Sequence, residues 1–320
     1  MPSNQRFAPT EYLALPLLIP PPFFIMRLSL MLTAFAAPVF AQKATTGFAG
    51  IGASNSVGGA TKYTCRTQAQ WNTVANNAKT HGFGAIRITG FDCDALNRAS
   101  SAAATYGVKV LAGIWIQGTV AQSMASINSD VQAFRAAYSR WGAGRYAGLT
   151  IGNEVNDSPA NIMAKVYDVR GYLRSQGVST PISTVHTWVN IRDNPTLCGA
   201  DFVAANAHTF YDGNRNSGQA GDFVFGLVVP SLRAKCPGKP VVITESGWPS
   251  KGSRFGSKAV ASFEDERKAI ISLDCAARRD KSVSVYAFEF DDQLWKGNDN
   301  ERSFGMFWKL NLSGDVLKKC

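Results

Sequence analysis

The sequence predicts one α/β domain folded as a (β/α)8 TIM barrel. Three observations indicate this fold. Short runs rich in β-branched residues alternate with segments of helical apolar periodicity from residue 47 onward. Eight such runs occur, and no linker, low-complexity tract or internal repeat interrupts the chain after residue 42. Eight consecutive βα units without a second domain are typical of the (β/α)8 barrel.

The N-terminal residues have the layout of a secretory leader. An apolar run at 28–40 follows the positive Arg27 and ends in small residues before Gln42. We therefore expect three segments, which are an upstream extension at 1–25, a signal peptide at 26–41 and the barrel domain at 42–320.

An uncleaved membrane anchor over 12–41 is the alternative for this leader. Pro16 and the prolines at 20–22 disfavour it, because they leave an apolar part shorter than the roughly 20 residues that span a bilayer. No later apolar stretch has spanning length. We expect no stable membrane insertion.

The expected strands and helices follow in alternation. The strands are apolar runs at 47–53, 85–89, 108–114, 148–153, 182–185, 202–207, 241–245 and 283–288. Helical periodicity is clearest at 68–81, 95–106, 123–141, 160–175 and 263–280.

A doubly wound sheet is the rival architecture, because residues 47–52 resemble a degenerate glycine-rich nucleotide loop. No helix opens directly after Gly52, however, and the acidic residue expected about 20 positions later is missing. The sequence therefore favours the barrel and does not favour nucleotide binding.

The cysteines and the charge indicate an extracellular protein. Six cysteines form an even set without a Cys-x-x-Cys pair, which favours disulfides over metal ligation. They allow 15 pairings, and the sequence does not choose among them. We expect pairing in chain order, which joins Cys65 to Cys93, Cys198 to Cys236 and Cys275 to Cys320.

The formal charge is +10, and it becomes +9 without residues 1–41, which hold two arginines and one glutamate. The basic residues are scattered, and no nucleic-acid motif is present. We therefore expect no nucleic-acid partner. An acidic extracellular matrix, or simply solvent, is the expected surrounding of this basic surface.

Two expected strands each end on a glutamate. Residues 150–155 have the sequence TIGNEV, which contains Glu154, and residues 241–250 have the sequence VVITESGWPS, which contains Glu245. Burying a carboxylate without partners costs several kcal/mol, so such residues are usually kept for chemistry. A structural ion pair is the plain alternative for either glutamate alone.

The two glutamates are expected to share one site, because active sites of such barrels gather at the carboxyl ends of the strands. Two carboxylates across a cleft are the working parts of glycoside hydrolysis. The sequence excludes a serine hydrolase with Ser246 as its nucleophile, because Thr244 stands where the nucleophile elbow needs glycine. No histidine and carboxylate spacing suggests a metal site.

These two motifs closely resemble the signatures of glycoside hydrolase family 17. The resemblance covers nearly all of 47–310, and residues 86–93, 206–211 and 288–296 look like further blocks of the fungal secreted β-1,3-glucanases and glucanosyltransferases. It implies a retaining mechanism with Glu154 as general acid/base and Glu245 as nucleophile, and no cofactor or metal.

Physical chemistry supports this division. Glu245 must stay ionised, and Arg87 and Tyr211 are the candidate donors to it. Glu154 must hold a proton, which the charge of Glu245 and partial burial favour. A retaining pair also predicts carboxyl groups about 5 to 5.5 Å apart.

The resemblance implies further substrate contacts. Asn153 resembles the residue that binds the sugar 2-hydroxyl in related barrels, although a turn cap is its plain alternative. Trp248 and Trp295 are candidate faces for a glucose ring, with Tyr286 and Trp115 as weaker ones, and core packing competes with each. The family places polar cleft residues where this chain has Glu289, Asp292 and Lys296.

This chain departs from the family at Gln293, where many members carry an acid, and at His186, expected after the fifth strand, where fungal relatives often have aspartate. These changes put the acceptor contacts in doubt. His208 is expected at a strand end near the cleft, and His81 at a helix end on the surface.

We therefore expect a secreted or wall-located, monomeric, cofactor-free enzyme that cleaves β-1,3-glucan polysaccharide or oligosaccharide. A β-1,3-glucanosyltransferase is the close alternative, because both reactions share the glycosyl-enzyme intermediate. A wall-binding barrel without catalysis is the alternative from another class.

Overall fold

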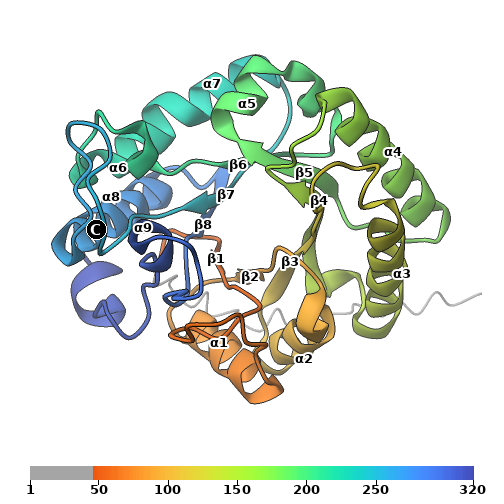
Figure 1. Ribbon diagram of the computed structural model, residues 1–320, viewed down its shortest axis with the longest axis horizontal. Helices are drawn as coiled ribbons and strands as arrows, with labels where there is room; N and C mark the ends of the chain where they lie inside the picture. Colours follow the sequence, from red (N-terminus) through yellow and green to blue (C-terminus); the bar gives the residue numbers. More distant parts are fainter. Residues whose placement is uncertain (1–45) are drawn as a thin grey trace, which may run out of the picture. The chain divides into compact units, whose positions relative to one another are not determined.

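The computed structural model describes residues 46–320 as a closed barrel of eight parallel strands (Figure 1). The predicted upstream extension and signal peptide lie outside the described residues. The strands are β1 (Gly50–Gly52), β2 (Ala85–Arg87), β3 (Lys109–Ile114), β4 (Tyr146–Asn153), β5 (Ile182–Thr187), β6 (Val203–Asn206), β7 (Val241–Ser246) and β8 (Val283–Ala287). All eight predicted strands are confirmed. The rival doubly wound sheet is wrong, because β1 pairs with both β2 and β8.

Helices surround the barrel. They are α1 (Gln68–Thr80), α2 (Ala95–Tyr106), α3 (Met124–Trp141), α4 (Pro159–Ser175), α5 (Trp188–Asp193), α6 (Ala220–Asp222), α7 (Val229–Lys235), α8 (Phe263–Arg279) and α9 (Asp299–Arg302). A π-helical segment, Phe223–Val228, joins α6 to α7. The five helices predicted by periodicity are confirmed.

Side-chain caps explain where several helices begin. Thr67 and Gln70 form a capping box at the start of α1. Ser158 accepts a hydrogen bond from Asn161 N at the start of α4, and Ser262 caps α8 in the same way. These caps satisfy backbone N–H groups that have no partner within the helix.

The core lies between the strands and the helices. Trp71 of α1, Ile86 of β2 and Phe134 of α3 are fully buried in one continuous apolar cluster. Tyr286 of β8 is also buried, and it packs in a smaller cluster with Ala85, Leu111 and Phe202. The expectation that Tyr286 offers a face to sugar is therefore wrong.

Three disulfides join the predicted pairs. Cys65–Cys93 links the loop after β1 to the loop after β2, Cys198–Cys236 links the turn after α5 to the end of α7, and Cys275–Cys320 ties the last residue to α8. The pairing in chain order is confirmed.

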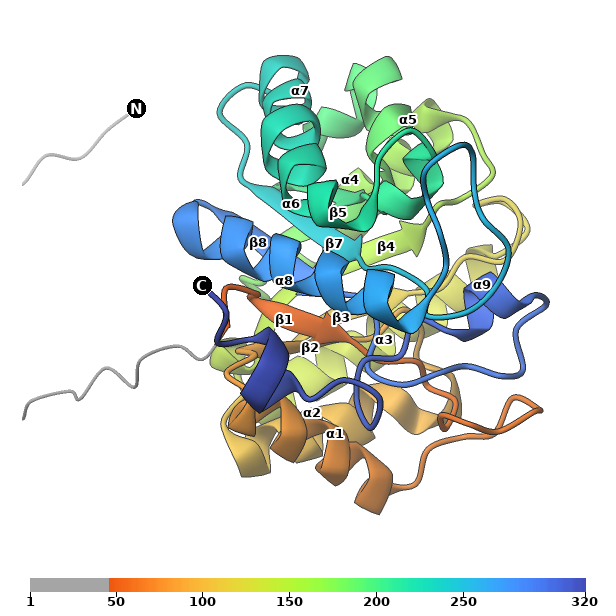
Figure 2. The ribbon, with the colours of Figure 1, turned by 90° about the vertical axis from the view of Figure 1, so that its left-hand side faces the viewer.

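The long loops lie at the carboxyl end of the barrel. In Figure 2 the strands run toward the side that carries α9 and the loop after β7, and the C-terminus lies at the other end. We call residues 247–262 the β7 loop and residues 288–310 the β8 loop. The predicted strand-end residues therefore share one end of the barrel.

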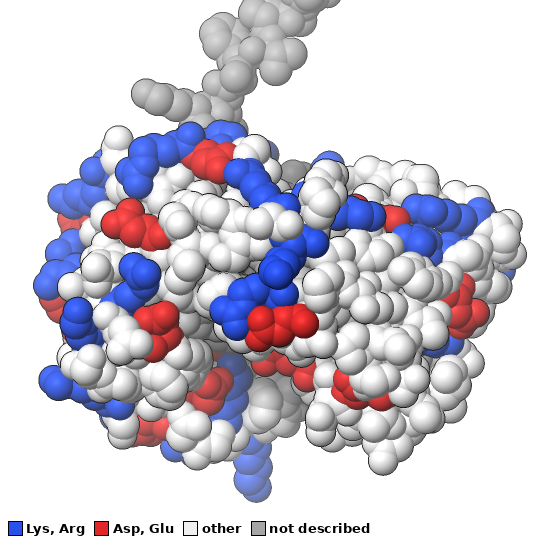
Figure 3. Space-filling model, turned by 90° about the horizontal axis from the view of Figure 1, so that it is seen from above, with Lys and Arg blue, Asp and Glu red and all other residues white. Residues whose placement is uncertain are grey.

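Basic and acidic side chains are mixed over the face that Figure 3 shows. This distribution agrees with the scattered charges of the sequence. No helix among residues 46–320 is long and apolar enough to cross a membrane.

Candidate active site

Two cavities meet at the carboxyl end of the barrel. The cavity of about 570 Å³ is lined by Trp188, Phe223 and Tyr211, and we call it the Trp188 arm. The cavity of about 690 Å³ contains Trp115 instead, and we call it the Trp115 arm. Both are lined by Glu154, Asn206, Glu245, Phe288 and Glu301. The two predicted glutamates thus lie where the arms join.

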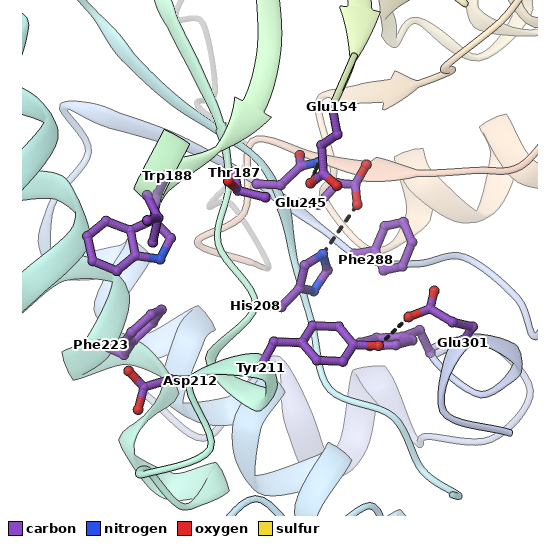
Figure 4. A pocket seen from close by; sticks show the side chains of 13 residues that line it. Glu154, Thr187, Trp188, His208, Tyr211, Asp212, Phe223, Glu245, Phe288 and Glu301 are labelled. Carbon is purple, nitrogen blue, oxygen red and sulfur yellow. Dashed lines mark hydrogen bonds and ion pairs between the residues drawn. The ribbon is translucent and has the colours of Figure 1, made fainter. Parts of the chain in front are cut away.

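Glu245 lies in β7 and is buried between two cationic or polar neighbours. Arg87 Nη1 donates to its Oε1 at 2.5 Å, and His208 Nε2 donates to its Oε2 at 3.2 Å (Figure 4 draws the histidine contact). Burial opposes ionisation, but the charge of Arg87 and the contact with His208 outweigh it and lower the pKa of Glu245 to about 2. Glu245 is therefore ionised over the ordinary pH range.

Glu154 follows β4, and the strand end aims it into the cleft. The pairing of β4 with β5 is irregular between Thr150 and Asn153, and Glu154 has a left-handed φ of 51°. Its N–H donates to Val185 O at 2.8 Å, which holds this sparsely populated conformation in place. Figure 4 shows its side chain pointing toward Glu245.

The surroundings of Glu154 raise the pKa of its carboxyl group. Burial raises its pKa, and the negative charge of Glu245 adds to this effect. The hydrogen bond from Asn206 Nδ2 to Oε1, at 2.8 Å, opposes it. The environments of the two glutamates therefore move their pKa values in opposite directions, as acid/base chemistry requires.

Asparagines hold this arrangement together. Arg87 Nη2 donates to Asn153 Oδ1 at 2.8 Å, so one arginine contacts both Glu245 and Asn153. Asn206 Nδ2 also lies 3.2 Å from Asn153 Oδ1, and Thr244 Oγ1 donates to Asn206 Oδ1 at 2.8 Å. The predicted residues Asn153 and Arg87 are thus brought to the glutamates, and Asn206 is a site residue that sequence reasoning missed.

The predicted contact of Tyr211 with Glu245 is wrong. The Tyr211 hydroxyl donates to Glu301 of α9, as Figure 4 shows, and His208 takes the place next to Glu245. The hydroxyl of Tyr211 reaches across to the β8 loop, whereas His208 lies two residues after the end of β6. The position of His208 at a strand end was the signal in the sequence for its role. Glu301 had no such signal, because it lies on a short helix within a loop.

A second acid and base pair lines the Trp115 arm. Lys296 Nζ donates to Glu289 Oε1 at 2.9 Å, and the ammonium group lies 5.0 Å from the ring centre of Phe288. Burial raises the pKa of Glu289 to about 7, although Lys296 opposes the shift. The structure therefore places the predicted residues Glu289 and Lys296 in the cleft.

Asp292 and Trp248 are not in the cleft, which corrects two predictions. Asp292 lines neither arm, because it accepts hydrogen bonds from Lys309 Nζ and Gly305 N at 2.8 Å each. Trp248 is fully buried and donates from Nε1 to Val260 O at 2.8 Å. A side chain at Gly247 would lie 1.9 Å from Phe288 O, so the chain passes close to β8 there and Trp248 turns into the core.

The other tryptophans that were considered do reach the cleft. Trp115 is 46% exposed, and Trp295 lines the same arm, where its ring packs edge-on against Tyr63 at 4.9 Å. Exposed aromatic faces in a polar cleft suit the apolar faces of sugar rings.

The residues at the two departures from the family are buried. Gln293 donates to Asp291 and accepts from Trp295, so it supports Trp295 instead of lining the cleft. His186 lies within β5, not after it, and burial lowers its pKa to about 4. Neither residue lines the two arms.

Comparisons with known proteins show the family to which this chain belongs. Residues 54–308 match the family described as the BtgE/BtgC glycoside hydrolase domain. The cell surface mannoprotein MP65 of Candida albicans is 30% identical over 77% of this chain, and a probable family 17 glucosidase of Saccharomyces cerevisiae, SCW10, is 30% identical over 78%. The chain spans 62% of the length of each of these two relatives.

A solved structure supports the fold. The glycoside hydrolase family 17 β-1,3-glucanosyltransferase from Rhizomucor miehei matches 81% of this chain and 92% of its own, with a TM-score of 0.68 and 22% identity. An active-site mutant of that enzyme has been solved in complex with laminaritriose.

Proposed function

We propose that this chain, which belongs to glycoside hydrolase family 17 through its BtgE/BtgC glycoside hydrolase domain, cleaves β-1,3-glucan with retention of configuration. The observation that carries the proposal is the opposed environment of the two glutamates. Arg87 and His208 keep Glu245 ionised, whereas burial and the charge of Glu245 favour a protonated Glu154.

In this mechanism Glu245 attacks the anomeric carbon, and Glu154 protonates the oxygen of the leaving sugar. A covalent glucosyl-enzyme on Glu245 forms, and the bond to the leaving sugar breaks. Glu154, now ionised, then removes a proton from the incoming acceptor, and the acceptor oxygen displaces Glu245. Arg87 serves both steps, because it stabilises the carboxylate that attacks and later leaves.

Substrate contacts follow from the residues of the arms. We assign sugar binding to Asn153, Glu289, Lys296 and the exposed face of Trp115. The Tyr211 hydroxyl donates a hydrogen bond to Glu301, and we assign sugar binding at the junction of the arms to this pair as well. Trp248 and Asp292 have no direct part in this proposal.

Transfer to a sugar acceptor is the second candidate, because the cleft has room for an acceptor sugar beside the glutamates. The two arms extend from the same glutamates, so sugar residues can be held on both sides of the bond that is cleaved.

A product time course on reduced laminari-oligosaccharides tests the proposal. We expect activity in the wild-type protein and its loss in Glu245→Gln, while Glu264→Gln, an exposed change on α8, stays active. Products longer than the substrate mean that sugar is the main acceptor, and only shorter products mean hydrolysis. Equal results for the wild type and Glu245→Gln contradict the proposal.

Binding of the Glu245→Gln variant to insoluble β-1,3-glucan separates catalysis from the alternative of a wall-binding barrel. The names of the relatives and the three disulfides support a secreted or wall-located protein, and we propose that location for this chain. Size-exclusion chromatography with light scattering tests the proposed monomer.

A further inference from the structure

Glu266 of α8 is a buried acid that the proposed reaction does not use. Its residue is 0% exposed, and among residues 46–320 no group donates a hydrogen bond to either carboxylate oxygen. The nearest cation is Lys309, whose Nζ lies 3.4 Å from Oε2. A carboxyl group without hydrogen bonds in such a place is costly and calls for an explanation.

Lys309 is fully occupied by other partners. Its Nζ donates to Ser250 Oγ at 2.6 Å, to Asp292 Oδ1 at 2.8 Å and to Ser303 O at 3.1 Å. An ammonium group has three N–H donors, so these three bonds leave none for Glu266.

The partners of Lys309 belong to the two loops that shape the cleft. Ser250 lies in the β7 loop, and its N–H donates to Ser303 O of the β8 loop at 2.8 Å. Asp292 accepts from Gly305 N at 2.8 Å within the β8 loop. Between these anchored positions lies Phe304, which lines the Trp188 arm, and shortly before them lies Glu301, which lines both arms.

We propose that Lys309 is a positioning residue that fastens the β7 loop to the β8 loop and so holds Glu301 and Phe304 in the cleft, with Glu266 as the group that competes for it. The inference rests on the proposed function, because the affected step is glucan binding. Glu154 and Glu245 are held by β4, β7 and Arg87, independently of Lys309. Loss of Lys309 therefore affects substrate binding more than the chemical step.

The competition depends on pH. The charged groups that act on Glu266 are Lys309 and Asp292, and burial outweighs Lys309 and raises the pKa of Glu266 to about 8. Glu266 is neutral near pH 7 and leaves Lys309 to its three partners. Above that pKa, an ionised Glu266 draws Lys309 away from Ser250 and Asp292, and the two loops loosen.

Kinetics of the Lys309→Met variant on a laminari-oligosaccharide test the fastening. We expect KM to rise by about tenfold while kcat changes by less than about threefold, because ground-state binding is lost and the glutamates stay in place. Lys309→Arg should restore most of the affinity, since a guanidinium also donates to several acceptors. Lys258→Met removes another exposed lysine of the β7 loop and should leave KM unchanged. A normal KM in folded Lys309→Met overturns the proposal.

Amide hydrogen exchange of residues 299–306 gives a readout that does not need activity. We expect faster exchange in Lys309→Met than in Lys258→Met, whether or not the wild-type protein cleaves glucan. If the wild type is inactive but the two variants differ in exchange, only the proposed function is refuted. Equal exchange in the two variants overturns the fastening of the loops by Lys309. If Lys309→Met does not fold, Ser250→Ala removes one of the hydrogen bonds of Lys309 and should show the same change to a smaller degree.

Glu266→Gln tests the competition, because glutamine keeps the shape of the neutral acid and does not ionise. The quantity to measure is the ratio of the wild-type KM to the Glu266→Gln KM at the same pH. We expect this ratio to be near one at pH 6.5 and to rise between pH 7 and pH 9. The titrations of Glu154 and Glu289 are common to both proteins and cancel in this ratio. A ratio that stays constant with pH overturns the role of Glu266.

Discussion

At the scale of single residues, the ionisation of Glu245 depends on one buried arginine. Arg87 is 2% exposed and contacts both Glu245 and Asn153. Burial of Glu245 alone would raise its pKa, so the guanidinium reverses the direction of the shift. The strand-end glutamates and Arg87 were predictable because each stands at the end of an apolar run. The contact of His208 was not, because it depends on how the turn after β6 folds.

Replacing Arg87 with methionine tests this dependence. The pKa of Glu245 should rise, because the charge that lowers it is gone, and the acidic limb of the kcat/KM profile should move to higher pH. At the optimum, kcat/KM should fall by about 10²-fold or more, as for other groups that stabilise charge in a transition state. The measurement is a pH–rate profile on a laminari-oligosaccharide, with Arg267→Met, at a partly exposed arginine of α8 far from the cleft residues in the chain, as the control. An acidic limb that does not move contradicts the role of Arg87.

Two tryptophans should respond to substitution in different ways. Trp115→Ala should raise KM by about tenfold, because an exposed stacking face of about 1 to 1.5 kcal/mol is lost, and should leave stability unchanged. Trp248→Ala should lower the free energy of unfolding by about 3 to 5 kcal/mol, because it leaves a cavity in the core. Urea denaturation and oligosaccharide kinetics on both variants test this contrast. If Trp248→Ala has lower affinity without a loss of stability, Trp248 contacts the substrate and its placement in the core is wrong.

At the scale of elements, the loops after β1, β2, β7 and β8 decide which side chains reach the substrate. Cys65–Cys93 joins the first two of these loops, and Tyr63 and Asp92 beside it line the Trp115 arm. Loops are also where most of the failed predictions lie, at Trp248 and Asp292 and, after β6, at Tyr211. Apolar periodicity locates strands and helices, but the direction of a loop side chain depends on close contacts such as that of Gly247 with Phe288 O.

The double variant Cys65→Ser/Cys93→Ser tests the loops of the Trp115 arm. Opening a loop of this separation, 28 residues, should cost about 3 to 4 kcal/mol of unfolding free energy. KM for long oligosaccharides should also rise, since Tyr63 and Asp92 lose their tether. Cys198→Ser/Cys236→Ser opens a disulfide of separation 38 beside α7 and should lose similar stability with unchanged KM. Equal KM in the two double variants contradicts this role.

At the scale of the whole molecule, the barrel brings together residues that are far apart in the chain. Arg87, Glu154, His208 and Glu245 come from four strand ends, and closure of the barrel places them in one cleft. The fold was predictable because each strand is a distinct apolar run between helices. The way in which the two arms join was not predictable from the sequence, since it depends on loops from opposite sides of the carboxyl end of the barrel.

The anomeric configuration of the first product tests the central proposal most directly. Proton NMR of a laminari-oligosaccharide digest, recorded before mutarotation, reports the configuration of the newly formed reducing end. Double displacement through Glu245 predicts the β-anomer first, because two inversions restore the configuration of the substrate. The α-anomer as first product would show a single displacement by water and would contradict the assignment of Glu245 as nucleophile.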